Sequence, residues 1–343
     1  MLGGILALLS AAAFAFNNAS IRRGVLTGSV AQAMAITVPI GVPAFFLAAL
    51  ITGTLASVAE FSGKAILALS IAGPLHFVWG RYCNYRATRA LGSNLVAPAQ
   101  QVNLIVTLSL AIWILGEVLT PMRIAGILLI LVGPALTLRG KEAKAPSAVT
   151  SDAPADSDAE VIKNGADRPA LFVPNYAEGY TFALLSATGY GVSPVLVRFA
   201  IEDKGVGMGI AGGLVSYSAA AAVMLLILLW PGQLRHALSV KPESAKWFTI
   251  SGFLVCISQM FLYMAMTLAP VTVVAPITRL SILFRLYFSR LLNPHHEVFG
   301  GRVILGTIVS LSGALLLSLS TDVVTSLVPL PDTVVRVLHW QWP

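Results

Sequence analysis

The sequence predicts an all-α integral membrane protein whose ten transmembrane helices form two inverted repeats of five helices each. Three observations lead to this prediction: the composition, the length of the apolar stretches, and short sequences of the first half that return in the second. The 343-residue chain is 57% hydrophobic and 11% charged, with a mean hydropathy of +0.82. Soluble domains contain about 25% charged residues, so this composition excludes an ordinary soluble globular protein.

The apolar residues occur in stretches of about twenty, the length that an α-helix needs to cross roughly 30 Å of hydrocarbon. The first half contains stretches at 3–21, 30–52, 66–86, 94–115 and 122–138, and the second half at 180–200, 208–230, 247–268, 271–291 and 302–320. We interpret the first stretch as a transmembrane helix rather than a cleaved signal peptide. No Lys or Arg precedes it, and part of its sequence returns later in the chain.

The repeat appears as identical short segments at matching places in the two halves. Ala-Leu-Leu-Ser-Ala at 7–11 returns at 183–187, and Val-Ala-Pro at 96–98 returns at 274–276. Because each half has an odd number of predicted helices, the second half enters the membrane from the opposite side. This is an inverted-topology repeat, the arrangement from which alternating access can be built.

Glycines mark the last helix of each half. Gly126 and Gly133 correspond to Gly306 and Gly313, and the seven-residue spacing places each pair on one helix face. Small residues let helix backbones approach closely in a membrane. We therefore expect the fifth and tenth helices to pack together or to form the interface of a homodimer.

The domain organisation follows from the repeat. Residues 1–138 form the first five-helix unit and residues 179–320 the second. Residues 139–178 are rich in Ala, Pro, Ser and Asp and carry seven of the fifteen acidic residues, which predicts a flexible polar linker. Residues 321–343 are expected to be a tail, because this segment is too short and too often interrupted by proline to add another span.

The charged residues predict the environment of the protein and its orientation in the membrane. The net charge of +7 is better explained by loops that face anionic lipid than by nucleic-acid binding, because no basic tail is present. More basic residues follow the odd-numbered predicted helices than the even-numbered ones, which places the linker in the cytoplasm and both termini outside. Arg22 and Arg198 occupy the same repeat position but fall on opposite sides of the membrane. The alternative for these two arginines is a structural role that carries no information on orientation. We expect a multi-pass protein of a bacterial-type plasma (inner) membrane.

The third to fifth predicted helices of the first half carry a recognisable pattern. Residues 86–94 read Arg-Ala-Thr-Arg-Ala-Leu-Gly-Ser-Asn, and they are followed by Val-Ala-Pro at 96–98, Gly116-Glu117, Gly126-Ile127 and Gly133. This pattern resembles the EamA-type repeat of the drug/metabolite transporter superfamily, and the resemblance covers 1–138 and 179–320. The second half departs from it where Asn-Pro-His-His-Glu stands at 293–297. The resemblance implies a ten-helix carrier with a central cavity for a small-molecule substrate.

Two prolines are candidates for gating. Pro98 and Pro276 lie at the same repeat position in the fourth helix of each half. A proline inside a helix removes one backbone hydrogen bond and bends the helix, which frees carbonyl groups. Such a bend can line a site or act as a hinge, and the alternative is a simple packing kink.

Two arginines are the leading candidates for substrate binding. Arg81 corresponds to Gln259, and Gln101 corresponds to Arg279, so each half contributes one arginine and one glutamine at exchanged positions. Opposed halves would then aim two guanidinium groups, which bind carboxylate or phosphate in a bidentate manner, at the middle of the bilayer. Alternatively, Arg81 snorkels to an interface and Arg279 bonds carbonyls near Pro276. Arg285 and Arg290 lie nearer the helix end, and we expect them to snorkel.

Further polar residues in the predicted spans are expected either to contact substrate or to bond neighbouring helices. Together with the two arginines, the candidates for substrate contact are Gln100, Gln101, Asn103, Gln259, Asn17, Asn18, Tyr190 and Tyr263. His76 is more consistent with a hydrogen-bonded structural histidine than with a proton relay. Trp79 and Tyr82 either line the cavity or pack.

Missing residue types narrow the function. Apart from Glu117 at the end of the fourth predicted helix, no Asp or Glu lies within a predicted span. A cationic drug would therefore find no buried counter-charge. Small multidrug carriers of this superfamily use a glutamate in their first helix, where this chain has Asn17 and Asn18.

Two apparent motifs do not indicate a binding site. The Gly-x-Gly-x-x-Gly at 207–212 precedes an apolar helix and follows no strand, so it is no dinucleotide motif. The adjacent His295 and His296 lack the spacing of a helical zinc site. We expect no catalytic residue, no metal and no cofactor.

We therefore predict a secondary transporter of a small organic metabolite that works by alternating access, with export of an amino acid or related carboxylate as the leading hypothesis. A sugar- or nucleoside-like permease of the same fold is the close alternative. A non-transporting membrane protein or an integral membrane enzyme is less consistent with the sequence, because an enzyme needs buried acid/base or metal-binding groups.

Overall fold

The computed structural model describes residues 2–115, 120–138, 173–201, 205–268, 274, 277–318 and 331–340. Within these ranges all the regular secondary structure is helical. Pro276 and Glu117, and nearly all of the predicted linker, lie outside the described residues.

The helices of the first half follow the predicted apolar stretches, and several stretches consist of more than one helical piece. They are α1 (Leu2–Gly24), α2 (Val30–Thr37), α3 (Gly41–Ile51), η1 (Ala56–Glu60), α4 (Gly63–Gly73), η2 (Pro74–Gly80), α5 (Arg81–Leu91), α6 (Ser93–Gln100), α7 (Val102–Leu115) and α8 (Pro121–Leu138).

The described helices of the second half are longer and less interrupted. They are α9 (Tyr176–Ile201), α10 (Val206–Leu228), α11 (Gln233–Leu238), α12 (Pro242–Leu268), α14 (Ser281–Leu292), α15 (Gly301–Ser318) and α17 (Asp332–Leu338). The segments Leu2–Gly24, Val30–Ile51, Tyr176–Ile201, Gly207–Leu228 and Pro242–Leu268 are long and apolar enough to cross a membrane. The count of ten spans stays a prediction.

Two prolines explain the breaks near the middle of the first half. Pro74 has no N–H to donate inside its helix, and the backbone from Pro74 to Gly80 forms a π-helical turn. Pro98 lies inside α6, which ends two residues later, and the N–H of Gln101 bonds the Pro98 carbonyl at 3.1 Å. The chain is therefore interrupted near Pro98, as expected of a bending position.

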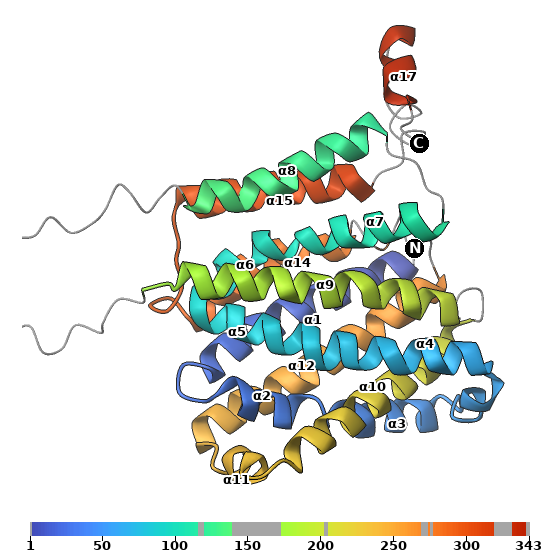
Figure 1. Cartoon of the computed structure of the whole chain (residues 1–343), viewed down its shortest axis with the longest axis vertical. Helices are drawn as coiled ribbons and strands as arrows, with labels where there is room; N and C mark the ends of the chain where they lie inside the picture. Colours follow the sequence, from blue (N-terminus) through green and yellow to red (C-terminus); the bar gives the residue numbers. More distant parts are fainter. Residues whose placement is uncertain are drawn as a thin grey trace, which may run out of the picture.

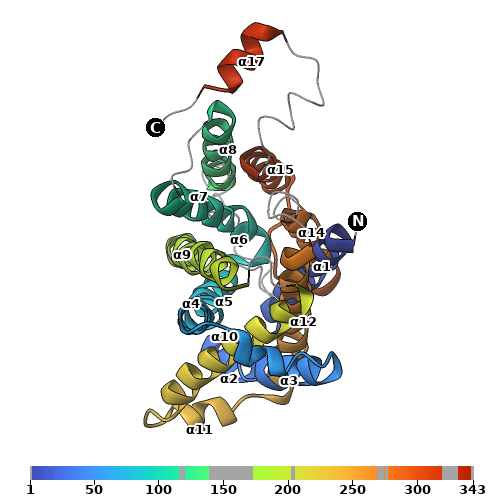
Figure 2. The same ribbon diagram turned by 90° about the vertical axis from the view of Figure 1, so that its right-hand side faces the viewer.

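The helices lie side by side in one bundle, and their contacts are exchanged between the halves (Figures 1 and 2). α1 packs against α12 and α14, and the corresponding helix α9 packs against the α4–η2–α5 rod and against α6 and α7. α8 packs against its counterpart α15, and α3 against α10. In Figure 1, α1 and α9 run in opposite directions across the bundle. This arrangement is what an inverted repeat requires.

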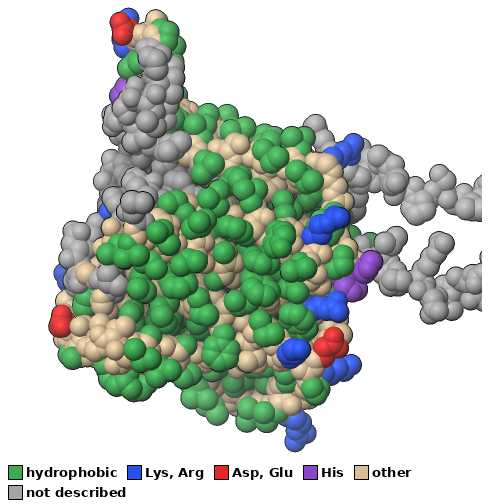
Figure 3. Space-filling model, turned by 180° about the vertical axis from the view of Figure 1, so that it is seen from behind, with side chains coloured by type: hydrophobic (Ala, Val, Ile, Leu, Met, Phe, Trp, Pro, Cys, Tyr) green, Lys and Arg blue, Asp and Glu red, His purple; other side chains and the backbone are tan. Residues whose placement is uncertain are grey.

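The surface of the bundle is apolar along the helices and basic at one end. Figure 3 shows a broad hydrophobic surface, with Lys, Arg and His side chains gathered at the edge where α8 ends and α9 begins, which we call the linker end. Ile51, Leu226 and Leu229 are 75%, 68% and 68% exposed. Such exposure is unfavourable in water and favourable in lipid.

Close glycine contacts hold α8 and α15 together. A Cβ atom on Gly313 would lie 2.7 Å from the Gly126 carbonyl oxygen and 2.7 Å from the Leu129 Cβ. Gly133 makes the corresponding approach to Ser310 and Gly306. Of the two roles expected for these glycines, the structure shows packing of the two helices within one chain.

We predict that Gly313→Val destabilises the protein by about 1–3 kcal/mol, because the side chain forces α15 away from α8. Thermal unfolding in detergent measures the effect. The control is Gly301→Val on the same helix, where a Cβ atom meets nothing within 4 Å. Equal Tm values for the two variants would contradict a close helix contact at Gly313.

Candidate functional site: a central cavity with two arginines

A cavity of about 190 Å³ lies where the two halves meet. Its lining comes from α1 and α9, from η2 and α12, and from α6–α7 and α14 with the segment that leads into it. These are three repeat-related pairs of predicted spans. The described parts of α2, α3, α8, α10 and α15 contribute no lining residue. The cavity therefore lies on the axis that exchanges the halves, where a carrier of this architecture binds its substrate.

The cavity brings together six of the ten residues that the sequence suggests for substrate binding. These residues are Gln100, Gln101, Asn103, Tyr190, Gln259 and Arg279. Apolar side chains complete the wall, among them Phe14, Leu104, Leu262 and Met266. No acidic residue belongs to the lining in the described part of the chain.

Arg279 is the least satisfied cation of the cavity. Its Nη1 donates to the Asn103 Oδ1 at 3.3 Å, while its Nε is buried without a hydrogen-bond partner. The ion pairs seen among the described residues, Arg22–Glu297 and Arg86–Glu178, do not involve it. A half-buried guanidinium with free hydrogen-bonding capacity is suited to receiving an anionic group.

Arg285 also lines the cavity, and the expectation that it snorkels to the interface is wrong. Its residue is 3% exposed, and its Nη1 donates to the Gln100 Oε1 at 3.0 Å and to the Ser93 carbonyl at 3.4 Å. Its Nε has no partner. The buried positions of α14 are Ile282, Arg285 and Ser289, and their spacing of three and four residues is the sequence signal for an inward face. Arg290 is exposed, as expected.

Asn84 does not line the cavity but supports Gln100 in its wall, and the sequence reasoning missed it. Its Oδ1 accepts from the Gln100 Nε2 at 2.7 Å, and its Nδ2 donates to the Asn18 Oδ1 at 3.3 Å. The chain of bonds from Arg285 through Gln100 and Asn84 to Asn18 therefore joins α14, α6, α5 and α1. Its repeat counterpart is Leu262, so comparison of the halves did not single it out.

Asn17 and Asn18 do not line the cavity. The Asn17 Oδ1 accepts from the Ser251 Oγ at 2.6 Å, which ties α1 to α12, and the Asn18 Nδ2 donates to the Phe14 carbonyl at 2.7 Å. Both residues are buried. The bonds from Ser251 to Asn17 and from Asn84 to Asn18 correspond to the interhelical alternative rather than to direct substrate contact.

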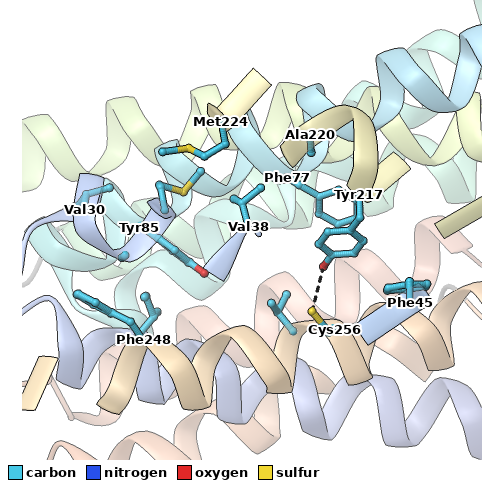
Figure 4. Close-up of a cluster of buried hydrophobic side chains, with 14 of the residues drawn as sticks. Val30, Val38, Phe45, Phe77, Tyr85, Tyr217, Ala220, Met224, Phe248 and Cys256 are labelled. Atoms are coloured by element: carbon cyan, nitrogen blue, oxygen red, sulfur yellow. Dashed lines mark hydrogen bonds between the residues drawn. The ribbon is translucent and has the colours of Figure 1, made fainter. Parts of the chain in front are cut away.

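Arg81 lies outside the cavity lining. Its Nη1 donates to the Thr37 carbonyl at 3.1 Å, and its Nη2 donates to the Tyr217 hydroxyl at 3.0 Å. Its guanidinium carbon is 5.1 Å from the centre of the Phe77 ring. Figure 4 shows Phe77 and Tyr217 within the buried hydrophobic cluster, where the Tyr217 hydroxyl points toward Cys256. The arginines that share the cavity are thus Arg279 and Arg285, not Arg279 and Arg81.

Tyr263 packs in the interior rather than in the cavity wall. Its ring lies edge-on to Phe45, with centroids 6.4 Å apart. Trp79 is half-exposed and donates its Nε1–H to the Leu185 carbonyl at 3.2 Å. Tyr82 accepts a bond from Arg86. These three aromatic residues are absent from the described lining.

His76 lies in the π-helical turn and faces the cavity. Its Nδ1 is 2.7 Å from the Ser193 Oγ, and its Nε2 is 3.4 Å from the Gln259 Nε2. An amide nitrogen only donates, so Nε2 acts as the acceptor and Nδ1–H donates to the serine. His76 is therefore placed as a neutral, hydrogen-bonded imidazole that fixes Gln259.

We predict that Asn84→Leu destabilises the fold by about 1–3 kcal/mol, because it leaves buried polar atoms of Asn18 and Gln100 without partners. Thermal unfolding in detergent checks this. Thr181→Val is the control, since Thr181 is exposed and bonds only within its own helix. A loss no greater than that of the control would mean that the bonds to Asn84 contribute little.

Comparison with known proteins agrees with this architecture. A crystal structure described only as "Crystal structure of protein" is 20% identical, covers 92% of this chain and 94% of its own, and superposes with a TM-score of 0.53, which shows the shared fold. No curated protein sequence matches the chain closely enough to count as a relative. The model of the EamA-like transporter family matches residues 1–139 and 177–319. Because this match includes most of the chain and both repeats, the protein belongs to the EamA-like transporter family and is a multi-pass membrane transporter of the drug/metabolite superfamily.

Proposed function

We propose that this protein is a secondary transporter that binds a small carboxylate in the central cavity and moves it across the membrane by alternating access. One observation carries the proposal: Arg279 and Arg285 line the same cavity, and no described lining residue is acidic. The proposed direction is export of an amino acid or related carboxylate across a bacterial-type plasma membrane.

The electrostatics favour an anionic ligand. Removing a guanidinium group from water costs several kcal/mol unless an opposite charge or hydrogen bonds offset the loss. Arg285 donates to two acceptors, at 3.0 and 3.4 Å, whereas among the described residues Arg279 donates to one, the Asn103 Oδ1 at 3.3 Å. A carboxylate beside Arg279 accepts two parallel N–H bonds and neutralises the charge. A cation would add to the unfavourable charge.

The remainder of the lining suits a small molecule with polar and apolar parts. The amides of Gln100, Gln101, Asn103 and Gln259 both donate and accept, so they can orient hydroxyl, amino or carboxyl groups. Phe14, Leu104, Leu262 and Met266 provide an apolar wall for a short side chain. The volume of about 190 Å³ is in keeping with an amino acid or a small organic acid rather than a large drug.

The packing supports alternating access. The main contacts between the halves have exchanged counterparts, and this symmetry supports ten spans in two inverted halves. The basic edge at the linker end supports a cytoplasmic linker by the positive-inside rule (Figure 3). Both termini would then lie outside.

We predict that carboxylates raise the Tm of the detergent-purified protein and that Arg279→Gln weakens their binding by about 10- to 100-fold, since a hydrogen bond to a charged group contributes roughly 1.5–3 kcal/mol. The measurement is a thermal-shift series with acetate, succinate, L-alanine and L-glutamate, because a ligand stabilises the folded state by RT ln(1 + [L]/Kd).

Arg290→Gln is the matched control, because Arg290 is an exposed arginine on α14. It should leave carboxylate affinity unchanged. Sugars, nucleosides and cationic dyes complete the series. Stabilisation by sugars or nucleosides without any response to carboxylates would reject the anionic substrate and favour the permease alternative.

A further inference from the structure

Three segments meet at the linker end of the bundle, where α8 ends and α9 begins, and buried polar bonds join them. We call Arg22, Ser93, Asn94, Asn293 and Glu297 the latch. Arg22 lies near the end of α1, Ser93 and Asn94 begin α6, and Asn293 and Glu297 follow α14. The latch therefore joins elements of the first half to the α14–α15 loop of the second half.

Glu297 caps a helix that has no cap of its own. The residue before α6 is Gly92, which has no side chain to bond the free N–H groups and adopts a φ of 82°. The side chain of Glu297 is 0% exposed, and its oxygens accept from the Ser93 N–H at 2.7 Å and the Asn94 N–H at 3.1 Å. A carboxylate at a helix N-terminus is favourable, because the first N–H groups lack partners within the helix.

Arg22 closes the same junction from the other side. Its Nε and Nη2 donate to the His296 carbonyl at 3.1 and 2.6 Å, and its Nη1 donates to the Thr88 and Arg89 carbonyls at 3.1 and 2.9 Å. Its Nε lies 3.9 Å from the Glu297 Oε1. This side chain is 1% exposed. Asn293 adds a bond to the Ala19 carbonyl at 2.8 Å.

The latch lies beyond the linker-side limit of the cavity. On α1 the described lining runs only from Ser10 to Phe14, and on α14 it ends at Arg285. Both helices then continue into the latch. Arg285 belongs to both regions, because one Nη1 atom reaches the Gln100 Oε1 in the cavity wall and the Ser93 carbonyl in the latch.

The two repeats differ at this feature. Arg198 occupies the repeat position of Arg22, yet Arg198 is exposed whereas Arg22 is buried. Equivalent positions in different surroundings are expected of an inverted repeat held in one of two access states.

We propose that Arg22 and Glu297 close the cavity at the linker end, and that Arg285 couples this closure to the anion bound beside Arg279. The coupling part rests on the proposed function. An anion in the cavity attracts the Arg285 guanidinium away from the Ser93 carbonyl. Occupancy of the cavity thereby changes the stability of the latch, and the coupling is reciprocal.

Cysteine labelling tests the closure. Ser289 is 0% exposed and its Oγ bonds the Ser93 Oγ at 2.7 Å, so Ser289→Cys is a probe that is covered while the latch is shut. The native Cys83 and Cys256 are buried and are replaced by alanine in the background protein. The reaction rate with a water-soluble maleimide is measured on the full chain in detergent.

We expect Glu297→Gln and Arg22→Gln each to raise the labelling rate of the probe roughly tenfold or more, since each removes charged hydrogen bonds from the latch. Arg290→Gln, on the same helix but exposed, should leave the rate unchanged. Ala19→Cys, also buried, is the second probe if Ser289→Cys does not yield monodisperse protein. Rates equal to the control in both latch variants would overturn the closure.

The coupling is tested with the carboxylate that gives the largest Tm shift among acetate, succinate, L-alanine and L-glutamate. At saturation it should change the labelling rate of the probe about fivefold or more, in the usual range of coupling between sites. Arg285→Gln should abolish this response at a carboxylate concentration that saturates the variant. A bound carboxylate that leaves the rate unchanged would reject the coupling. If no carboxylate binds, the proposed coupling fails together with the proposed function. The labelling rate of the probe in the Glu297→Gln variant still tests whether the latch closes the cavity.

Discussion

The structure depends on how buried guanidinium groups are satisfied inside an apolar bundle. Arg22, Arg81 and Arg285 are all under 4% exposed, and each donates hydrogen bonds to acceptors on other helices. Because a buried cation is costly without partners, these bonds tie the helices to defined positions. Arg279 differs from them, since among the described residues it donates to one acceptor, the Asn103 Oδ1 at 3.3 Å. In the proposed function, a bound anion supplies the acceptors that Arg279 lacks.

The repeat made much of this architecture predictable. Matching residues in the two halves predict matching helices, and a binding cavity in an inverted repeat lies where the halves meet. Residues placed near the prolines of the fourth and ninth predicted helices, such as Gln101 and Arg279, therefore line the cavity. The glycine spacing likewise predicts the contact between α8 and α15, because only small residues permit that approach.

The errors come from differences between the halves that the repeat conceals. Arg81 and Gln259 are equivalent in sequence, but the helix before Arg81 contains the π-helical turn that starts at Pro74. The corresponding part of α12 contains Gly252 and continues without interruption. A π-turn adds a residue to one turn and rotates the following side chains around the helix axis. Arg81 consequently faces Thr37 and Tyr217, while Gln259 faces the cavity. Arg285 was misjudged for a related reason: its position along a helix suggested an interface, whereas its face determines its burial.

The same comparison of equivalent positions bears on mechanism. In an inverted repeat, the two access states exchange the conformations of the halves, so a residue pair related by the repeat samples both environments. Arg22 is buried among three carbonyl oxygens, and Arg198 is exposed. In the first half, the helix-1 arginine lies against a carboxylate that caps α6. A chain with fully equivalent halves would stabilise both states equally. The longer Asn-Pro-His-His-Glu loop at 293–297 makes the latch side chemically distinct, which favours closure at the linker end and makes release of that closure depend on the charge in the cavity.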